Sequence, residues 1–127
     1  MTEKISRIRF NYKIWMETGN DESVLGDGKW KLLKAIEEEG SLKGAMDKLN
    51  LTYRKTWDNL KKIENTLGFP VINPTRGGAE GGSTCLTREG RMIVAAFDRF
   101  HQKYDAYIQN ACREVISEII SEFREKD

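Results

Sequence analysis

The stretch of sequence that decides the fold runs from Gly40 to Gly68: GSLKGAMDKLNLTYRKTWDNLKKIENTLG. Glycine at both ends is typical of helix termini, because it adopts the left-handed C-terminal conformation without a side-chain clash. Ser41 and Thr52 stand where helices would start, and hydroxyl side chains are favoured N-caps. The predicted elements are a short helix over 42–49, a tight turn at Asn50 and Leu51, and a longer helix that ends at Leu67. Two helices joined by so short a turn predict a helix-turn-helix.

The longer helix separates an apolar side from a polar side when its residues are projected at about 100° each. The apolar side, which we expect to pack on the two preceding helices, holds Tyr53, Trp57, Leu60, Ile63 and Leu67. Trp57 is therefore expected in the core rather than as a stacking platform. The polar side holds Arg54, Lys55, Asp58, Asn59 and Lys62.

This polar side predicts a surface that contacts DNA, with the first half of the helix in the major groove. Arginine and lysine donate to guanine, and asparagine pairs with adenine. Near the helix start, hydroxyl groups and free backbone N–H groups can hold phosphates. A solvated helix face is the alternative for any one of these residues. The predicted DNA contacts in this stretch are Ser41, Thr52, Tyr53, Arg54, Lys55, Thr56, Asn59 and Lys62.

Upstream, apolar and polar residues alternate over Ile5–Trp15, which predicts a half-buried strand. A turn and a short partner strand over 23–25 would complete an N-terminal hairpin. Asp27 is the predicted N-cap of a helix that runs to about Glu39 and ends at Gly40. The apolar stripe of this helix consists of Trp30, Leu32, Leu33 and Ile36.

Downstream, Phe69, Val71 and Ile72 predict a strand, and Thr84–Leu86 predicts its return. The glycine-rich stretch 76–83 between them predicts the tip of a wing, with Arg76 reaching DNA flanking the site. Glycine-rich loops also cradle phosphates in nucleotide-binding enzymes. That alternative is disfavoured, because neither a GxxxxGK[ST] pattern nor a βαβ unit around GxGxxG is present.

From Thr87, a predicted N-cap, a single helix is expected to run to about Arg124. Its apolar positions recur at steps of three and four: Ile93, Phe97, Phe100, Tyr104, Ile108, Ala111, Val115 and Ile119. This stripe is longer than one small domain can cover, so we expect it to pack against a two-fold partner chain. The alternative is a helix that folds back along its own core.

The chain has 127 residues and a net charge of +1, ordinary values for one globular domain. We expect an α+β fold, mostly α. Residues 1–86 would form the hairpin and DNA-binding part, and residues 87–127 the dimerisation helix of the same unit. The charge is uneven, since residues 41–67 carry six basic and three acidic side chains, whereas the tail is acidic. This distribution suits a localised contact with nucleic acid.

Several function classes are disfavoured. His101 is the only histidine, and the two cysteines lack CxxC spacing, so we expect reduced thiols, no metal site and no cofactor. No catalytic residues stand out, and we do not expect an enzyme. No apolar run approaches the roughly 18 residues that span a bilayer, and the N-terminus does not resemble a secretory signal. We expect a cytoplasmic protein with no membrane contact.

The residues Gly40-Ser41-Leu42, Ala45, Leu49, Leu51-Thr52-Tyr53-Arg54, Trp57, Leu60, Glu64 and Leu67-Gly68 together resemble the LysR-type winged helix-turn-helix. More narrowly, the chain looks like the N-terminal domain of the ModE family of molybdate-responsive regulators. Besides the N-terminal hairpin, the narrower likeness rests on Tyr53-Arg54 with Trp57-Asp58, and on Gly77-Gly78 and Gly81-Gly82 running into Leu86-Thr87 and Gly90. It covers about residues 5–110 and leaves out the apolar turns at 115–123.

The resemblance implies a domain that dimerises through its long last helix and binds palindromic operators. Oxyanion-binding domains that sense molybdate commonly follow it in that family. Because this chain ends at Asp127, we expect a stand-alone DNA-binding module and do not carry molybdate sensing over to it.

We therefore expect a homodimeric, sequence-specific transcription regulator that binds double-stranded DNA. A link to molybdate-related gene control is implied by the resemblance alone. The alternative is an interaction module that keeps the fold but binds protein, which the near-neutral charge and the apolar end of the last helix would suit. A small-molecule or oxyanion sensor at the dimer interface is a weaker third hypothesis, because no cluster of donors stands out there. No effector is identified.

Overall fold

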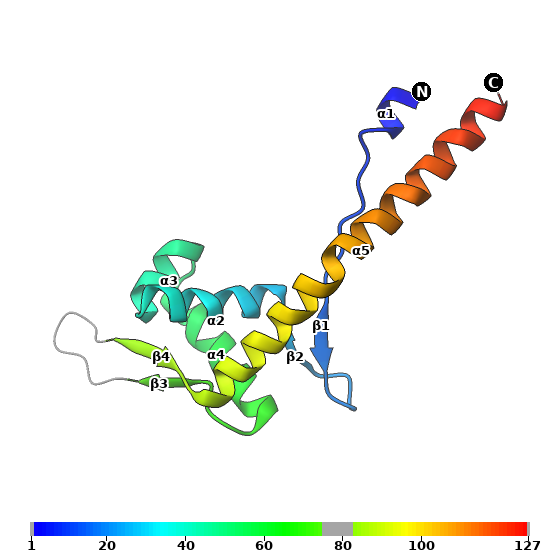
Figure 1. The fold of residues 1–127 in the computed structure, drawn as a ribbon. Helices are drawn as coiled ribbons and strands as arrows, with labels where there is room; N and C mark the ends of the chain where they lie inside the picture. The colour runs from blue at the N-terminus through cyan, green and yellow to red at the C-terminus, as the bar shows by residue number, and fades with distance from the viewer. Residues whose placement is uncertain (1, 75–82, 127) are drawn as a thin grey trace. The chain divides into compact units, whose positions relative to one another are not determined.

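The computed structural model describes residues 2–74 and 83–126 (Figure 1). The chain is mostly helical with two small antiparallel sheets, as predicted for an α+β fold. It divides into two compact units. The central unit comprises Lys13–Phe97, and the terminal unit comprises Met1–Tyr12 and Asp98–Asp127. The long helix α5 (Arg88–Lys126) begins in the central unit and continues into the terminal unit.

Three helices of the central unit form where the sequence predicts them. They are α2 (Asp27–Glu39), α3 (Leu42–Leu49) and α4 (Tyr53–Leu67). Gly40 ends α2 at φ 69° and Gly68 ends α4 at φ 81°, a left-handed conformation that glycine adopts at little cost. The prediction that Asp27 is the N-cap of α2 is wrong. Gly26 occupies the cap position, and Asp27 is the first residue of the helix. A carboxylate in the first turn still favours the helix, because it faces the positive end of the dipole.

Two hairpins flank these helices. In the first, β1 (Trp15–Glu17) pairs antiparallel with β2 (Ser23–Gly26). In the second, β3 (Ile72–Pro74) pairs antiparallel with β4 (Thr84–Leu86), directly after α4 as predicted. The predicted tip of this second hairpin, with Arg76, lies outside the described residues.

The N-terminal segment differs from its prediction. A short helix, α1 (Thr2–Ile5), comes first, the segment after it has neither helix nor paired strand, and β1 begins only at Trp15. The predicted strand over Ile5–Trp15 is therefore wrong. An alternating sequence becomes a strand only where a neighbour completes its hydrogen bonds, and the short β2 reaches only the end of this segment. Within the terminal unit, the Tyr12 hydroxyl instead donates a hydrogen bond to the Asp105 carboxylate.

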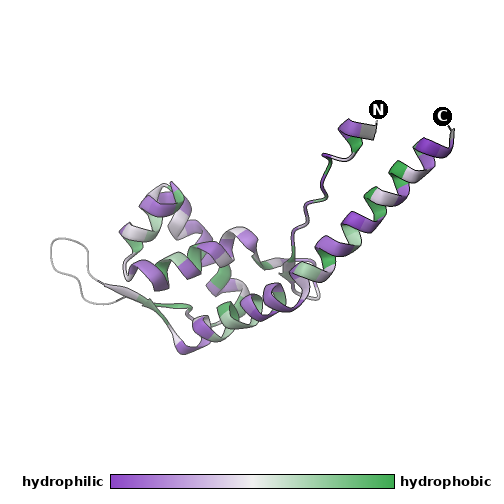
Figure 2. Cartoon of the chain, turned by 45° about the horizontal axis from the view of Figure 1, so that its top comes forward, coloured by the Kyte–Doolittle hydropathy of each residue, from purple (hydrophilic) through white to green (hydrophobic). Residues whose placement is uncertain are grey.

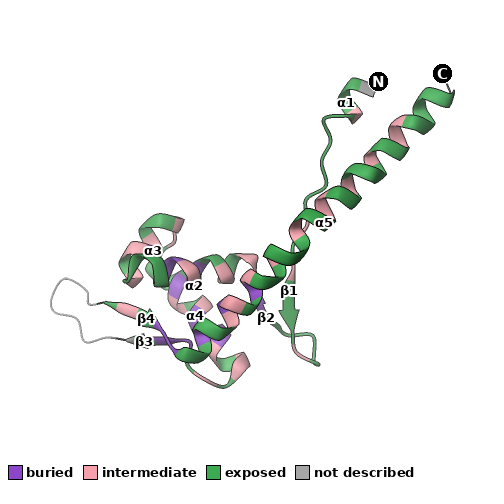
Figure 3. Ribbon diagram, viewed as in Figure 1, coloured by how far each residue is buried: buried purple, intermediate pink, exposed green. Residues whose placement is uncertain are grey.

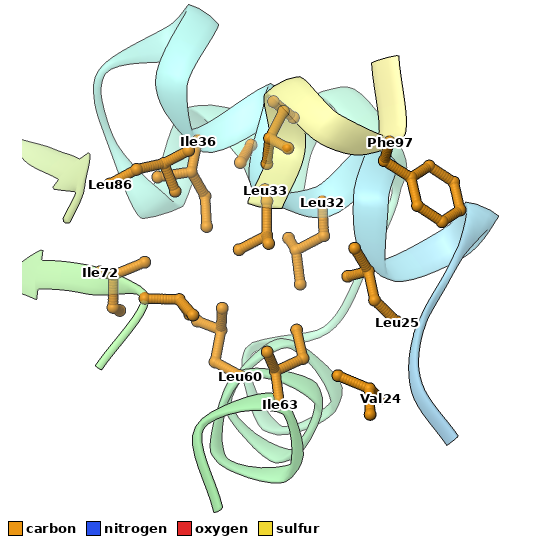
Figure 4. Close-up of a cluster of buried hydrophobic side chains, with 14 residues drawn as sticks. Val24, Leu25, Leu32, Leu33, Ile36, Leu60, Ile63, Ile72, Leu86 and Phe97 are labelled. Atoms are coloured by element: carbon orange, nitrogen blue, oxygen red, sulfur yellow. The ribbon is translucent and has the colours of Figure 1, made fainter. Parts of the chain in front are cut away.

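The apolar core of the central unit collects side chains from α2, α4, both hairpins and the start of α5 (Figure 4). Leu32, Leu33 and Ile36 of α2 are all buried, so the predicted stripe of this helix is confirmed. Trp30 is half-buried at the edge of the core, where its ring centroid lies 5.3 Å from that of Phe97. The core thus holds the start of α5 against α2.

Two polar contacts connect the second hairpin to its neighbours. The carboxylate of Glu64 in α4 accepts a hydrogen bond from the Val71 N–H at 2.8 Å, just before β3. Thr87 caps α5 as predicted, because its hydroxyl oxygen accepts a hydrogen bond from the Gly90 N–H at 3.0 Å. These contacts fix where the hairpin leaves α4 and where α5 begins.

Candidate nucleic-acid interface

A short connection joins α3 to α4. Asn50 ends α3 in the left-handed conformation at φ 54°, and its N–H donates to the Asp47 carbonyl at 3.4 Å. The Leu51 N–H donates to a carbonyl of the last turn of α3 at 3.0 Å, which holds the chain back against that helix. Thr52 then caps α4 as predicted, because its hydroxyl oxygen accepts a hydrogen bond from the Lys55 N–H at 3.2 Å. The turn is as tight as the sequence predicts.

Ser41 caps the other helix of the pair. Its hydroxyl oxygen accepts a hydrogen bond from the Gly44 N–H at 2.9 Å, and its side chain is half-buried. A hydroxyl that accepts one hydrogen bond still has its own O–H to donate. Ser41 therefore keeps a donor beside the start of α3.

The two sides of α4 differ in burial (Figure 3). Leu60 and Ile63 are completely buried, as predicted for the apolar side. The exposed side chains are Tyr53, Arg54, Lys55, Asp58, Lys61, Lys62 and Asn65, and Asn59 is half-buried. Sequence reasoning did not single out Lys61, although it follows Arg54 by seven residues and so lies two turns further along the same side. The helix thus presents a mainly basic surface.

Two aromatic residues of α4 are placed differently from one another. Tyr53, predicted to pack inside, is 65% exposed, so that prediction is wrong. It is the first residue of α4, and its ring meets Trp57 edge-on with centroids 6.1 Å apart. Trp57 is half-buried against the core, and its buried indole N–H finds no acceptor among the described residues.

Thr56 is completely buried, and its hydroxyl donates to the Thr52 carbonyl at 2.8 Å. The prediction that Thr56 contacts a phosphate is therefore wrong. A threonine in a helix can satisfy its hydroxyl on the preceding turn, and here the Thr56 side chain itself lies in the core. The exposed donors at the start of α4 come from Tyr53 and its neighbours instead.

The first turn of α4 also presents backbone donors. The Lys55 N–H is bound by Thr52, and the Thr56 N–H donates to the Thr52 carbonyl at 3.0 Å. The N–H groups of Tyr53 and Arg54 have no acceptor among the described residues. Free N–H groups at the positive end of a helix dipole attract anions.

Like charges meet between α2 and α4. Burial lowers the pKa of Lys29, and the neighbouring ammonium group of Lys62 lowers it further. The positive potential of α4 therefore extends to the first turn of α2. At the far end of α2, by contrast, Glu38 accepts a hydrogen bond from Lys48 at 2.6 Å, which raises the pKa of Lys48.

The predicted dimerisation residues fall into two groups. Phe97 is 4% exposed in the core of its own unit, and Ile93 is packed against that core. The prediction of a partner contact is therefore wrong for Phe97, because its side chain is buried in the core of the central unit. The rest belong to the terminal unit: Phe100, Tyr104, Ala111 and Val115 are exposed, and Ile108 and Ile119 are half-buried.

The terminal unit has no buried residue within its described part (Figure 3). Apolar positions nevertheless recur along α5 to its end (Figure 2). Its exposed large apolar residues are Ile8, Phe10, Phe100, Tyr104, Tyr107, Val115 and Phe123. A unit of this kind has apolar surface but no core in which to bury it.

Some classes of site are not found in the part of the chain that the structure describes. No group of three or more His, Cys, Asp or Glu side chains there could hold a metal ion. Cys85 and Cys112 are free thiols. Among residues 2–74 and 83–126, no helix has both the length and the apolar character needed to cross a membrane.

Known proteins resemble the chain over part of its length. It is 36% identical over 84 residues to the molybdenum transport protein ModE of Azotobacter vinelandii, a match covering 66% of this chain and 31% of that protein. It is 34% identical over 73 residues to the molybdenum-pterin-binding protein MopB of Rhodobacter capsulatus, covering 58% and 27%. It is 26% identical over 87 residues to the DNA-binding transcriptional dual regulator ModE of Escherichia coli K12, covering 68% and 31%.

The matched part spans less than a third of each of these relatives. No protein-family model matches the chain. The relatives carry names of transport, binding or regulatory proteins, and each name refers to a protein of which the shared part is 27% to 31%. Over more than half of its length, the chain is thus similar to proteins named ModE and MopB.

Proposed function

We propose that the chain is a sequence-specific DNA-binding transcription regulator of the winged helix-turn-helix type, and not an enzyme. Helix α4 would enter the major groove, and the β3–β4 hairpin would be the wing. The observation that carries the proposal is the exposed basic side of α4, with Arg54, Lys55 and Lys62 on a helix whose start is capped by Thr52. The tight connection to α3 supports it, because it leaves the first half of α4 free to approach DNA.

The residues divide by what they can recognise. Arg54 and Lys55 can donate to guanine, and Asn59 can pair with adenine through its amide. Phosphates would be held by Ser41, Thr52 and Tyr53, helped by the free N–H groups of the first turn. Lys62 would neutralise phosphate, as would Arg76, which lies outside the described residues.

We also propose that the chain acts as a homodimer through α5. The exposed Phe100, Tyr104 and Val115 support this, since a partner would bury apolar surface that the terminal unit leaves in water. A two-fold dimer would place two α4 helices in successive major grooves about 34 Å apart. Its site would then be palindromic.

The relatives suggest the regulated process. Proteins named for molybdenum transport, for molybdenum-pterin binding and for transcriptional regulation are similar to this chain over 73 to 87 residues. We therefore propose a role in molybdenum-related gene control.

Selection of bound sequences from a random DNA pool tests the proposal. We expect a palindromic consensus with half-sites one helical turn apart, and an affinity that falls steeply as salt displaces the phosphate contacts. The double variant Arg54→Ala with Lys55→Ala should lose the enrichment. The control, Lys31→Ala with Lys43→Ala, removes two exposed lysines outside α4 and should keep it. A pool that stays random after selection contradicts the proposal.

A second candidate function is a protein-interaction module. The exposed apolar residues of the terminal unit favour it, because such surfaces bind protein regardless of DNA. In that case Val115→Asp with Ile119→Asp would abolish binding of a partner protein, and Arg54→Ala with Lys55→Ala would leave it unchanged. This second function is contradicted if the α4 variant loses the selection of DNA sequences while neither the α4 variant nor the α5 variant changes the binding of a partner protein.

A further inference from the structure

A groove of about 540 Å³ lies within the terminal unit, between the N-terminal segment and α5. Ile8 and Phe10 line it from the segment, and Ile116 and Ile120 line it from the helix. Ile8 is 54% exposed and Phe10 is 43% exposed. The N-terminal segment therefore adds apolar surface beside that of α5, instead of covering it.

The groove is also cationic. Arg9 from the segment and Arg113 from the helix both line it, and no aspartate or glutamate does. Among the described residues Arg9 forms no ion pair, and Arg113 donates only to the side-chain oxygen of Asn110. Two guanidinium groups beside an apolar surface favour an occupant that has both apolar and acidic side chains.

Helix α5 itself has such a surface. Glu114, Glu118 and Glu122 follow one another at four-residue spacing, so they share one side of the helix. Val115 and Phe123 lie on the neighbouring side and are exposed. Glu114 and Glu118 line a second hollow of α5 together with Arg113, and among the described residues neither glutamate forms an ion pair with Arg9 or Arg113. Acidic and basic groups that form no ion pair within one copy can pair between two copies.

We propose that a second copy of this chain covers the groove, with its α5 packed against Ile8 and Phe10 and its glutamates facing Arg9 and Arg113. The inference rests on the proposed homodimer and adds the N-terminal segment to its interface. A two-fold axis that runs between the basic and the acidic surface places the arginines of one copy against the glutamates of the other. The symmetry repeats the contact, so the glutamates of the first copy also meet the arginines of the second. Both salt-bridge sets then form at once.

A second copy fits better than an unrelated protein. The groove and the acidic stripe both belong to the terminal unit, which buries no residue within its described part. A small anion would engage the arginines but would leave Ile8, Phe10 and Phe123 in water. One identical chain satisfies the charges and the apolar residues together.

Sedimentation equilibrium of the full chain, with and without charge reversal, tests this inference. Arg9→Glu with Arg113→Glu gives a chain that is acidic on both surfaces, and Glu114→Arg with Glu118→Arg gives one that is basic on both. Each variant alone should dimerise at least about tenfold more weakly than the wild type, since close charge pairs couple strongly across interfaces. An equimolar mixture should form a heterodimer of about wild-type affinity. That recovery would show that both variants fold.

Two controls complete the test. Arg88→Glu reverses an exposed charge on the same helix outside the groove and should leave the dimer unchanged. Ile8→Ser with Phe10→Ser should weaken the dimer, whereas Met92→Ser, which removes a 60% exposed apolar side chain elsewhere on α5, should not. A wild-type chain that stays monomeric overturns the proposed homodimer itself. A wild-type dimer that every groove variant preserves, with no gain on mixing, overturns only the role of the groove.

Discussion

A β-carbon on Gly90 would lie 2.4 Å from the carbonyl oxygen of Val71. The first turn of α5 therefore rests directly on the backbone that leads into β3. The same carbonyl accepts a hydrogen bond from the Thr87 N–H at 2.9 Å. This close approach anchors the start of α5 to the end of the α4–β3 connection, and it requires a residue without a side chain.

The substitution Gly90→Ala should destabilise the chain by about 1–3 kcal/mol, because the added methyl group meets backbone that cannot move aside cheaply. Elsewhere in a helix the same change would stabilise by about 0.5–1 kcal/mol. Gly28 in α2 provides that control, since a β-carbon there has no heavy atom within 4 Å. Denaturant unfolding followed by circular dichroism measures both. Equal stabilities for Gly90→Ala and Gly28→Ala would contradict the steric assignment.

The carboxylate of Glu64 provides the second prediction. It accepts hydrogen bonds from the N–H groups of Val71 at 2.8 Å and Ile72 at 3.4 Å. Since Val71 is completely buried, Glu64→Ala leaves its N–H without an acceptor and should cost about 1–3 kcal/mol. Asn65→Ala, at the next and exposed position of α4, should change the free energy of unfolding by less than about 0.5 kcal/mol. If the thermal melts of Glu64→Ala and Asn65→Ala coincide, the Glu64 carboxylate does not anchor the backbone that leads into β3.

Residues that act on their own chain neighbours could be predicted from the sequence. The ends of α3 and α4 depend on Ser41, Thr52 and Gly68, whose effects extend over three or four residues. The same holds for the buried stripe of α2, which follows from helical spacing alone. For this reason the helix positions agree with their predictions, and so does the basic side of α4.

Residues whose role depends on distant parts of the chain could not be predicted in this way. The alternation over residues 5–15 indicates a strand, but only the fold determines whether another strand lies beside it. Glu37 is similar, since its carboxylate accepts a hydrogen bond from the N–H of Leu86 in β4 at 3.3 Å. Phe97 has the spacing of the α5 stripe, yet its position beside Trp30 places it in the core.

The third prediction concerns Thr56. Thr56→Val keeps the shape of the side chain and removes only its hydrogen bond to the Thr52 carbonyl, which still accepts the Thr56 N–H. The free energy of unfolding should therefore fall by about 1 kcal/mol, and DNA affinity should stay within about twofold because the residue is buried. Thr52→Ala, which removes the cap of α4, should destabilise by about 0.5–2 kcal/mol. A large loss of DNA affinity in Thr56→Val would instead support a contact between the Thr56 hydroxyl and a phosphate, which the burial of Thr56 argues against.

The last prediction separates the roles of Arg54 and Lys62 on the exposed side of α4. In the proposed complex Arg54, in the first turn, would donate two hydrogen bonds to one guanine. Arg54→Ala should therefore cost about 1–3 kcal/mol on the selected site and relax the preference at one base pair. Lys62, two turns later and beside Lys29, would contact phosphate in the same complex. Lys62→Ala should weaken all sequences alike and reduce the slope of log affinity against log salt by about one.

Fluorescence anisotropy at several salt concentrations, on the selected site and on point-mutated sites, measures both effects. Lys43→Ala in α3 is the matched control, since it removes an exposed lysine from a helix that the proposal does not place in the groove. If the two variants lost affinity with the same salt slope and the same base preference, α4 would bind DNA only through charge. Different slopes with different base preferences require instead that the start of the helix contacts base edges while its second half contacts phosphates.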